Sequence, residues 1–432
     1  MQQDVRKAQS GGLNFRDAAA TNSISLIMEG SKTPAILLLN IPAGAFCGIN
    51  LLSFTTSPRF QGIKNLPPGW HLVFTGATTS LSVRHGVWFK IDSLSHPPAD
   101  LIIKKWNAEK EELVAETDQT ALLHWRANLG SIWKEGLTPY RQSAATATSN
   151  EAEPVEEKHD WRDLTDCITA NLLSRITGGS SDHWTLTSAS SAKQDMEDIP
   201  GLSTEDFEPE QELGFLPVNL KQTWRQGAVG RERTEAAQDR SWALGDLVEN
   251  YCGSEGEREI VGEMQFTFLM VLTLANYSCL EQWKRILGLV FTCKAALRER
   301  SEFYVKVLKV LKLQLQHCND VDGGLFDLSE EGGALLKQLL KQLRRAVDDV
   351  IKEEQSPVKD ELEELEGFLR TQHGWELSDS YVRRGMLELE DGEQVEMEIN
   401  DLEGEDERGE YAPVIVDLGG HGHSVDDTTN ED

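Results

Sequence analysis

The feature that most constrains the fold is a largely apolar stretch in the second half of the chain, 262–293, with the sequence GEMQFTFLMVLTLANYSCLEQWKRILGLVFTC. In its first half the apolar side chains fill more than one face of a helix, and such a helix must be enclosed by protein or by lipid. The uninterrupted run of low polarity, 266–275, has ten residues, about half of the roughly 20 that cross a bilayer. Glu263 and Gln265 mark one end of this run and Asn276 marks the other. We therefore expect a central helix that is enclosed by protein.

The second half of the stretch predicts an amphipathic helix that covers the central one. Its apolar positions repeat with helical spacing: Leu280, Trp283, Leu287, Val290 and Phe291. Charged residues occupy the opposite side, where Glu281 can pair with Arg285 one turn later. Trp283 lies beside these charges, and we interpret it as a core tryptophan in preference to an interface anchor.

The charge balance limits the partners of the chain. Its 432 residues include 42 basic and 72 acidic ones, which gives a net charge of −30. Duplex nucleic acid and anionic membrane surfaces are therefore excluded as expected partners, because Lys and Arg supply the affinity for phosphate. The six cysteines form no CxxC pair, and the N-terminus has no apolar signal segment. Together these features predict reduced thiols and a location in the cytoplasm, the nucleus or both.

Turn residues and periodicity predict an α+β protein with two domains. We expect a disordered extension (1–22), an antiparallel β-sandwich-like N-terminal domain with flanking helices (23–190), a linker (191–212), an all-α C-terminal domain (213–380) and a disordered acidic tail (381–432). Within the N-terminal domain, strands are predicted at 35–39, 70–75, 86–91, 100–106, 112–115 and 183–188, and helices at 118–133 and 161–176. In the C-terminal domain, helices are predicted at 232–251, 258–277, 279–298, 301–317, 332–354 and 357–372.

No pattern in the sequence predicts catalysis, a metal site or a cofactor. The segment 320–324 (DVDGG) faintly resembles a calcium loop, but the flanking positions that need carboxylates lack them. His421 and His423 lie in the acidic tail, where we interpret them as solvated. His71 follows a Pro-Pro-Gly turn, and packing explains it better than a role as general base, which nevertheless stays as an enzyme alternative. Asn276 begins a glycosylation sequon, but its helix is predicted to be buried.

One apolar island inside the acidic tail, 411–418, has the composition of a β-strand. Such a segment can add a strand to the edge of a partner's sheet, where backbone hydrogen bonds give affinity and alternate side chains give specificity. The predicted partner-binding residues are therefore Pro413, Val414, Ile415, Val416, Asp417 and Leu418.

Three blocks of the sequence together resemble the cistron-splicing factor AAR family. They are Gly48 to His71 (with Phe60-Gln61-Gly62-Ile63-Lys64-Asn65-Leu66-Pro67-Pro68-Gly69-Trp70), Gly262 to Leu269 with Asn276-Tyr277 and Gln282-Trp283-Lys284, and Ala412 to Leu418. The blocks occur in the family's order, and the resemblance spans about residues 25 to 418.

This resemblance implies a non-enzymatic assembly factor of the U-five small nuclear ribonucleoprotein. Members of that family bind the large spliceosomal scaffold protein Prp-eight at its RNase H-like and Jab/MPN-like domains. They thereby hold back premature binding of the Brr-two helicase and of RNA. The family's C-terminal segment contributes strand addition to the partner, which agrees with the interpretation of 411–418. An acidic factor of this kind can also cover a basic scaffold and screen it from RNA.

Two further hypotheses accompany this interpretation. Phosphorylation in the Ser/Thr-rich segments 141–150 or 178–191 would release the scaffold by charge repulsion, and Ser/Thr-to-Glu changes that leave scaffold affinity unchanged would contradict this. The alternative function is an acidic chaperone for basic proteins such as histones, with 388–410 as the active segment. It predicts binding with steep salt dependence and little sequence preference.

Overall fold

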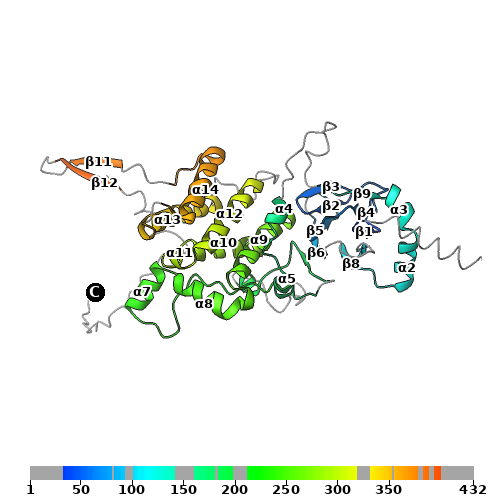
Figure 1. Cartoon of the computed structure of the whole chain (residues 1–432), viewed down its shortest axis with the longest axis horizontal. Helices are drawn as coiled ribbons and strands as arrows, with labels where there is room; N and C mark the ends of the chain where they lie inside the picture. Colours follow the sequence, from blue (N-terminus) through cyan, green and yellow to red (C-terminus); the bar gives the residue numbers. More distant parts are fainter. Residues whose placement is uncertain are drawn as a thin grey trace, which may run out of the picture. The chain divides into compact units, whose positions relative to one another are not determined.

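The computed structural model describes residues 33–79, 82–92, 101–141, 160–180, 183–197, 212–318, 331–352, 355–377, 383–388 and 394–399. The described chain divides into two units, Met1–Trp375 and Glu376–Asp432. The first unit contains a sheet-rich N-terminal region with flanking helices and a helical C-terminal region (Figure 1), as the sequence predicted. The exact domain boundaries stay a prediction.

The N-terminal region consists of two five-stranded sheets in the orders β8-β7-β1-β4-β9 and β10-β6-β5-β2-β3. The strands are β1 (Ala35–Leu39), β2 (Phe46–Ile49), β3 (Leu52–Thr55), β4 (Gly62–Lys64), β5 (Gly69–Gly76), β6 (Arg84–Ile91), β7 (Leu101–Asn107), β8 (Glu112–Ala115), β9 (Leu137–Pro139) and β10 (Thr185–Thr187). The second sheet is antiparallel throughout, as expected. In the first sheet β1 pairs with β7 and β4 pairs with β9 in parallel, which corrects the prediction of purely antiparallel pairing. Parallel pairing needs long crossover connections, which short-range strand patterns do not reveal.

The inner faces of the two sheets meet in one apolar core. Val87, Phe89 and Ile91 of β6 lie in that core, as the alternation of the strand predicted. The outer face of the first sheet is covered by helices α2 (Gln119–Ala127) and α3 (Leu129–Glu135). Trp88 lies on the opposite face of β6 and is only 1% exposed. Both faces of this strand are thus buried, so the second sheet must be covered by another part of the protein.

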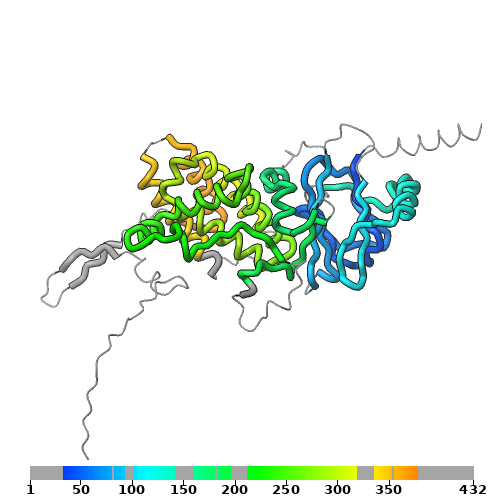
Figure 2. Tube along the Cα trace, turned by 90° about the horizontal axis from the view of Figure 1, so that it is seen from below, coloured from blue at the N-terminus to red at the C-terminus, as the bar shows by residue number. Residues whose placement is uncertain are grey.

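The helical region is built around α9 (Glu257–Leu274), which packs against helix α10, helix α12, helix α5 and strand β6. Every residue from Ile260 to Val271 is buried, so the predicted enclosed helix is confirmed. The other helices are α4 (Asp160–Asp163), α5 (Ala170–Thr177), α6 (Lys193–Glu197), α7 (Arg231–Gln238), α8 (Ser241–Tyr251), α10 (Tyr277–Val290), α11 (Ala296–Glu299), α12 (Ser301–His317), α13 (Glu331–Val350) and α14 (Pro357–His373), with the 3₁₀ turn η4 (Gly253–Glu255). Figure 2 shows the segment 160–180 between the strands and the helices that follow it in the chain.

Four predicted helices, 118–133, 161–176, 232–251 and 279–298, are each split in two. The break between α7 and α8 has a clear cause. The Asp239 carboxylate accepts hydrogen bonds from the backbone N–H groups of Ser241, Lys294 and Ala295, at 3.0, 2.8 and 3.0 Å. It thereby holds the starts of two helices, an arrangement that a continuous helix could not provide. The partner of Asp239 at 294–295 lies far away in sequence, so local periodicity could not predict the break.

The second unit contains the antiparallel pair β11 (Arg383–Glu388) and β12 (Gln394–Ile399). The interpretation of 381–432 as a disordered tail did not anticipate this hairpin. All six cysteines are free, as predicted, and five of them are buried. Within the described ranges, none of the helices is both long enough and apolar enough to span a bilayer.

Candidate functional site

The partner-binding segment predicted from the sequence, Pro413 to Leu418, lies outside the described residues. The same holds for His421, His423 and the 320–324 segment. These interpretations therefore stay predictions.

His71 is packed between strands and is 1% exposed. Its Nδ1 lies 3.1 Å from the Asn50 Nδ2 donor, and its Nε2 lies 2.8 Å from the Pro67 carbonyl oxygen. Nε2 therefore carries the proton in this arrangement. The ring also stacks on Phe89, with 5.4 Å between centroids. Burial lowers the pKa of His71 to about 4. Packing thus explains His71, and the enzyme alternative that started from it has no support.

The outer face of the second sheet meets the helical region through three aromatic rings. Trp88 of β6 stacks on Trp161 of α4 and on Phe266 of α9, with 5.9 Å between ring centroids in each case. Arg84 adds a polar contact, since its Nη1 donates to the Thr273 carbonyl oxygen at 2.9 Å. We call this contact region, together with the polar groups described next, the domain junction.

Asn276 has a structural role at the domain junction. Its side-chain oxygen accepts from the Cys279 N–H at 2.8 Å and caps the start of α10. Its Nδ2 donates to the carbonyl oxygens of Thr187 and Ser190, at 2.9 and 2.7 Å. The residue is 1% exposed, which agrees with the interpretation that the sequon is a chance match.

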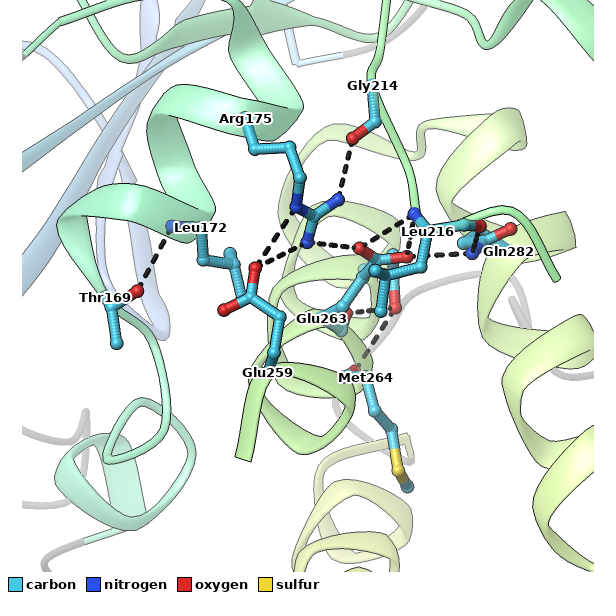
Figure 3. Close-up of polar contacts among 10 residues, drawn as sticks. Thr169, Leu172, Arg175, Gly214, Leu216, Glu259, Glu263, Met264 and Gln282 are labelled. Atoms are coloured by element: carbon cyan, nitrogen blue, oxygen red, sulfur yellow. Dashed lines mark hydrogen bonds and ion pairs between the residues drawn. The ribbon is translucent and has the colours of Figure 1, made fainter. Parts of the chain in front are cut away.

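The centre of the domain junction is the buried carboxylate of Glu263 on α9 (Figure 3). It accepts from the Leu216 N–H at 3.0 and 3.2 Å and from Gln282 Nε2 at 2.7 Å, and it pairs with Arg175 Nη2 at 2.7 Å. Arg175, on α5, also donates to Glu259 Oε1 at 2.8 and 3.1 Å. One carboxylate therefore ties together α5, α9, α10 and the segment at 216.

The Glu263 carboxylate is buried and depends on its partners. Its side chain is fully enclosed, whereas that of Arg175 is 28% exposed. Burial raises the pKa of the Glu263 carboxyl above its ordinary value, while Arg175, Gln282 and the Leu216 N–H oppose the rise. A buried charge must be paired and hydrogen-bonded to be tolerated, and here every partner comes from a different part of the chain. Among the described residues, no group of three or more His, Cys, Asp or Glu could hold a metal ion.

Gln265 fixes the turn between α4 and α5 to the same helix. Its Oε1 accepts from the Cys167 N–H at 3.0 Å, and its Nε2 donates to the Asp163 carbonyl oxygen and to Asp166 Oδ1, at 2.9 and 2.8 Å. Gly262 allows this close approach, because a Cβ there would lie 2.5 Å from the Cys167 carbonyl oxygen. Gly262, Glu263 and Gln265, within one turn of α9, thus build the domain junction together.

We expect Gly262→Ala to lower the free energy of unfolding by about 1–3 kcal/mol, because the added methyl group must displace backbone at Cys167. Urea denaturation measures this. Gly367→Ala on α14 is the matched control, since it is helical, exposed and has open space around the added Cβ. Alanine should stabilise the chain there by about 0.4–1 kcal/mol. Equal effects of the two changes would contradict the role given to Gly262.

Two ion pairs on α10 differ from the predicted pairing. Glu281 pairs with Lys284 at 3.0 Å and not with Arg285. Arg285 instead forms an ion pair with Asp195, in a segment predicted as linker. Trp283 is a core residue as predicted, 3% exposed, and its indole N–H donates to Gln314 Oε1 at 3.0 Å.

A second surface, which we call the aromatic groove, lies on the helical region. It is lined by Pro217, Val218, Asn219, Gln222, Trp224, Gln226, Trp242, Ala243, Asp246, Leu247, Tyr251 and Leu289 and has a volume of about 480 Å³. Sequence reasoning missed it, because its aromatic residues come from separate segments that only the fold brings together.

In comparisons with known proteins, both halves of the chain match models of the same family. Residues 32–178 match the model of the AAR2 N-terminal domain, and residues 215–378 match that of the AAR2 C-terminal repeat region. The relatives include proteins named AAR2 homolog from Pongo abelii and Homo sapiens, 25% and 24% identical over 311 residues, which are 67% of this chain and 76% of each relative. The AAR2 homolog of Caenorhabditis elegans is 25% identical over 307 residues, 66% of this chain and 78% of that protein.

Proposed function

This chain belongs to the AAR2 family, and from that premise we propose that it is a non-enzymatic splicing factor that acts in assembly of the U-five small nuclear ribonucleoprotein. Its proposed partner is the scaffold protein Prp-eight, bound at the RNase H-like and Jab/MPN-like domains within the U-five precursor. While bound, it keeps the Brr-two helicase and RNA away from the scaffold. We propose that it acts in the cytoplasm and in the nucleus.

The observation that carries this proposal is that AAR2 models match both halves of the chain, in order. The domain junction agrees with a binding role. Glu263 and Gln265, the polar residues of the AAR-like stretch on α9, contact other segments and hold the sheet-rich and helical regions together. The net charge of −30 supports the mechanism. An acidic factor repels RNA and complements a basic surface on a scaffold, so it can occupy that surface until it is released.

We expect the double change Val414→Asp and Val416→Asp to weaken binding to the purified scaffold domains about tenfold or more, measured by titration calorimetry. Both side chains would face the same side of an added strand, and two carboxylates there would oppose its docking. Deletion of Glu403–Glu410 is the control, and it should change the affinity much less.

The acidic chaperone for histones is the second candidate, and the charge of the tail is the observation that favours it. The same variants separate the two functions. If the Glu403–Glu410 deletion weakens scaffold binding more than the valine changes do, and binding falls steeply with salt, the strand-addition proposal is wrong. A pull-down from nuclear and cytoplasmic extracts with chains 1–432 and 1–385 would then show whether histones or the scaffold are retained.

A further inference from the structure

The aromatic groove exposes large apolar side chains that the fold does not use. Trp242 is 45% exposed and Tyr251 is 52% exposed, both on α8. Exposed aromatic side chains that line one groove, as Trp242 and Tyr251 do, are typical anchors of protein interfaces. Leu247 and Leu289 also line the groove and are buried.

The groove is held in shape by contacts behind it. Thr223 is 1% exposed, and its hydroxyl donates to the Ala236 carbonyl oxygen at 2.9 Å. Arg240 Nη1 donates to the Gly288 carbonyl oxygen and to Thr292 Oγ1, both at 3.1 Å. The guanidinium of Arg233 lies 5.6 Å from the ring centre of Trp224. A surface supported in this way loses little conformational entropy when a ligand binds.

The charge of the groove is negative. Asp246 is the charged residue among the described lining residues, and none of them is Lys or Arg. Its carboxylate accepts from Asn250 Nδ2 at 2.9 Å. Of the nearby arginines, Arg225 pairs with Glu232 at 2.9 Å and Arg231 with Glu235 at 2.6 Å, whereas Arg233 donates to the Ala228 carbonyl oxygen and lies against the Trp224 ring. A cationic group on a ligand would therefore complement this surface.

The polar lining fits an extended backbone. Gln222 and Gln226 contribute side-chain amides to the groove, alongside Pro217 and the three aromatic rings. A polyproline II segment has no internal hydrogen bonds, so its carbonyl oxygens accept bonds from such donors. Aromatic-lined grooves are the usual docking surface for segments of this kind.

We propose that the aromatic groove binds a proline-containing basic peptide segment of a protein partner in the polyproline II conformation. Its apolar residues pack against Trp242, Tyr251 and Trp224, and its Arg or Lys lies beside Asp246. This site is separate from the proposed strand addition and does not depend on the identity of the scaffold. The chain's own segment 411–418 contains Pro413, but it carries Asp417 and follows an acidic run, so its charge has the wrong sign for this groove.

The test uses the full-length chain and a fluorescein-labelled peptide, Arg-Pro-Leu-Pro-Pro-Leu-Pro, read by fluorescence anisotropy. We expect saturable binding that Trp242→Ala weakens about tenfold. Asp246→Asn should weaken binding of this peptide and leave binding of its Glu-Pro-Leu-Pro-Pro-Leu-Pro counterpart unchanged or improved. Leu123→Ala on α2, another exposed apolar position, is the control and should have no effect.

Because Trp242 is 45% exposed, its replacement should lower the thermal midpoint of the chain only slightly, and this is measured in parallel. Equal affinity for the Arg and Glu peptides, or affinity that survives Trp242→Ala, would overturn the proposal. No saturation at about 1 mM peptide would overturn it as well. If the 1–400 chain binds the peptide about tenfold more tightly than the full chain, the groove belongs to the tail of the same molecule, and the proposed partner is wrong.

Discussion

Arg175→Met should lower the free energy of unfolding at neutral pH by about 3–5 kcal/mol, one of the two largest effects that we expect for a single change in this chain. The reason is that Glu263 is fully enclosed and Arg175 supplies its positive partner at 2.7 Å. Methionine keeps most of the side-chain length but removes the charge, so the carboxylate is left buried without a cation. Equilibrium unfolding in urea, followed by tryptophan fluorescence, measures the change.

The stability deficit of Arg175→Met should depend on pH, whereas a deficit caused by a packing defect alone would not. Burial already raises the pKa of Glu263 above its ordinary value of 4.5, and loss of Arg175 removes one of the groups that oppose the rise. A carboxyl whose folded-state pKa is raised contributes stability below its unfolded-state pKa and loses that contribution as the pH rises through the folded-state pKa. The deficit of Arg175→Met against the wild type should therefore shrink as the pH is lowered from 8 to about 5.5.

Two further variants separate charge from packing. Adding Glu263→Gln to Arg175→Met should recover part of the lost stability, because the amide oxygen can still accept from the Leu216 N–H and no charge remains buried. Arg231→Met removes an ion pair of the same kind at an arginine that is 91% exposed, and it should have no measurable effect. A deficit that is independent of pH and unrelieved in the double variant would show that Glu263 does not need its cation.

The sequence was informative where burial follows the local period of the chain. The all-round apolar character of 266–275 predicted α9 as an enclosed helix, and the alternation of 86–91 placed Val87 and Phe89 in the sandwich core. It failed where one buried polar group serves several segments. Glu263 and Gln265 read as the polar end of a helix, yet both are fully buried. One sequence pattern could have indicated this buried polar cluster: Glu263 and Gln265 lie two positions apart, beside Gly262, in an otherwise apolar helix.

The two candidate binding surfaces also differ in how far local sequence patterns reveal them. The 413–418 segment was predicted from local composition, as an apolar strand pattern in an acidic tail, and it stays a prediction because it lies outside the described residues. The aromatic groove could not be chosen, because Trp224, Trp242 and Leu289 belong to segments that meet only through the breaks at Asp239 and beyond Val290. Side-chain caps made by distant residues set those breaks, and no periodicity encodes them.

Trp88→Ala should lower the free energy of unfolding by about 3–5 kcal/mol, because it removes a large ring from a closed aromatic stack. Trp88 is 1% exposed and Phe266 is fully buried, and the two rings stack at 5.9 Å across the junction between the second sheet and α9. The cavity left by alanine would be lined on one side by strands and on the other by helices, so neither side can close it alone. Urea denaturation measures the loss, and a matching fall in the thermal midpoint should accompany it.

Trp88→Phe is the matched control for this change. The indole N–H of Trp88 is buried and has no hydrogen-bond partner in the described part of the chain, so phenylalanine loses ring volume but no polar contact. Its cost should therefore be clearly smaller than that of alanine. In a double-mutant cycle, Trp88→Ala and Phe266→Ala should show a coupling energy of about 0.5–1.5 kcal/mol. Strict additivity of the two changes would mean that the rings do not stabilise each other, and the aromatic stack would then not be what holds the sheet domain to the helices.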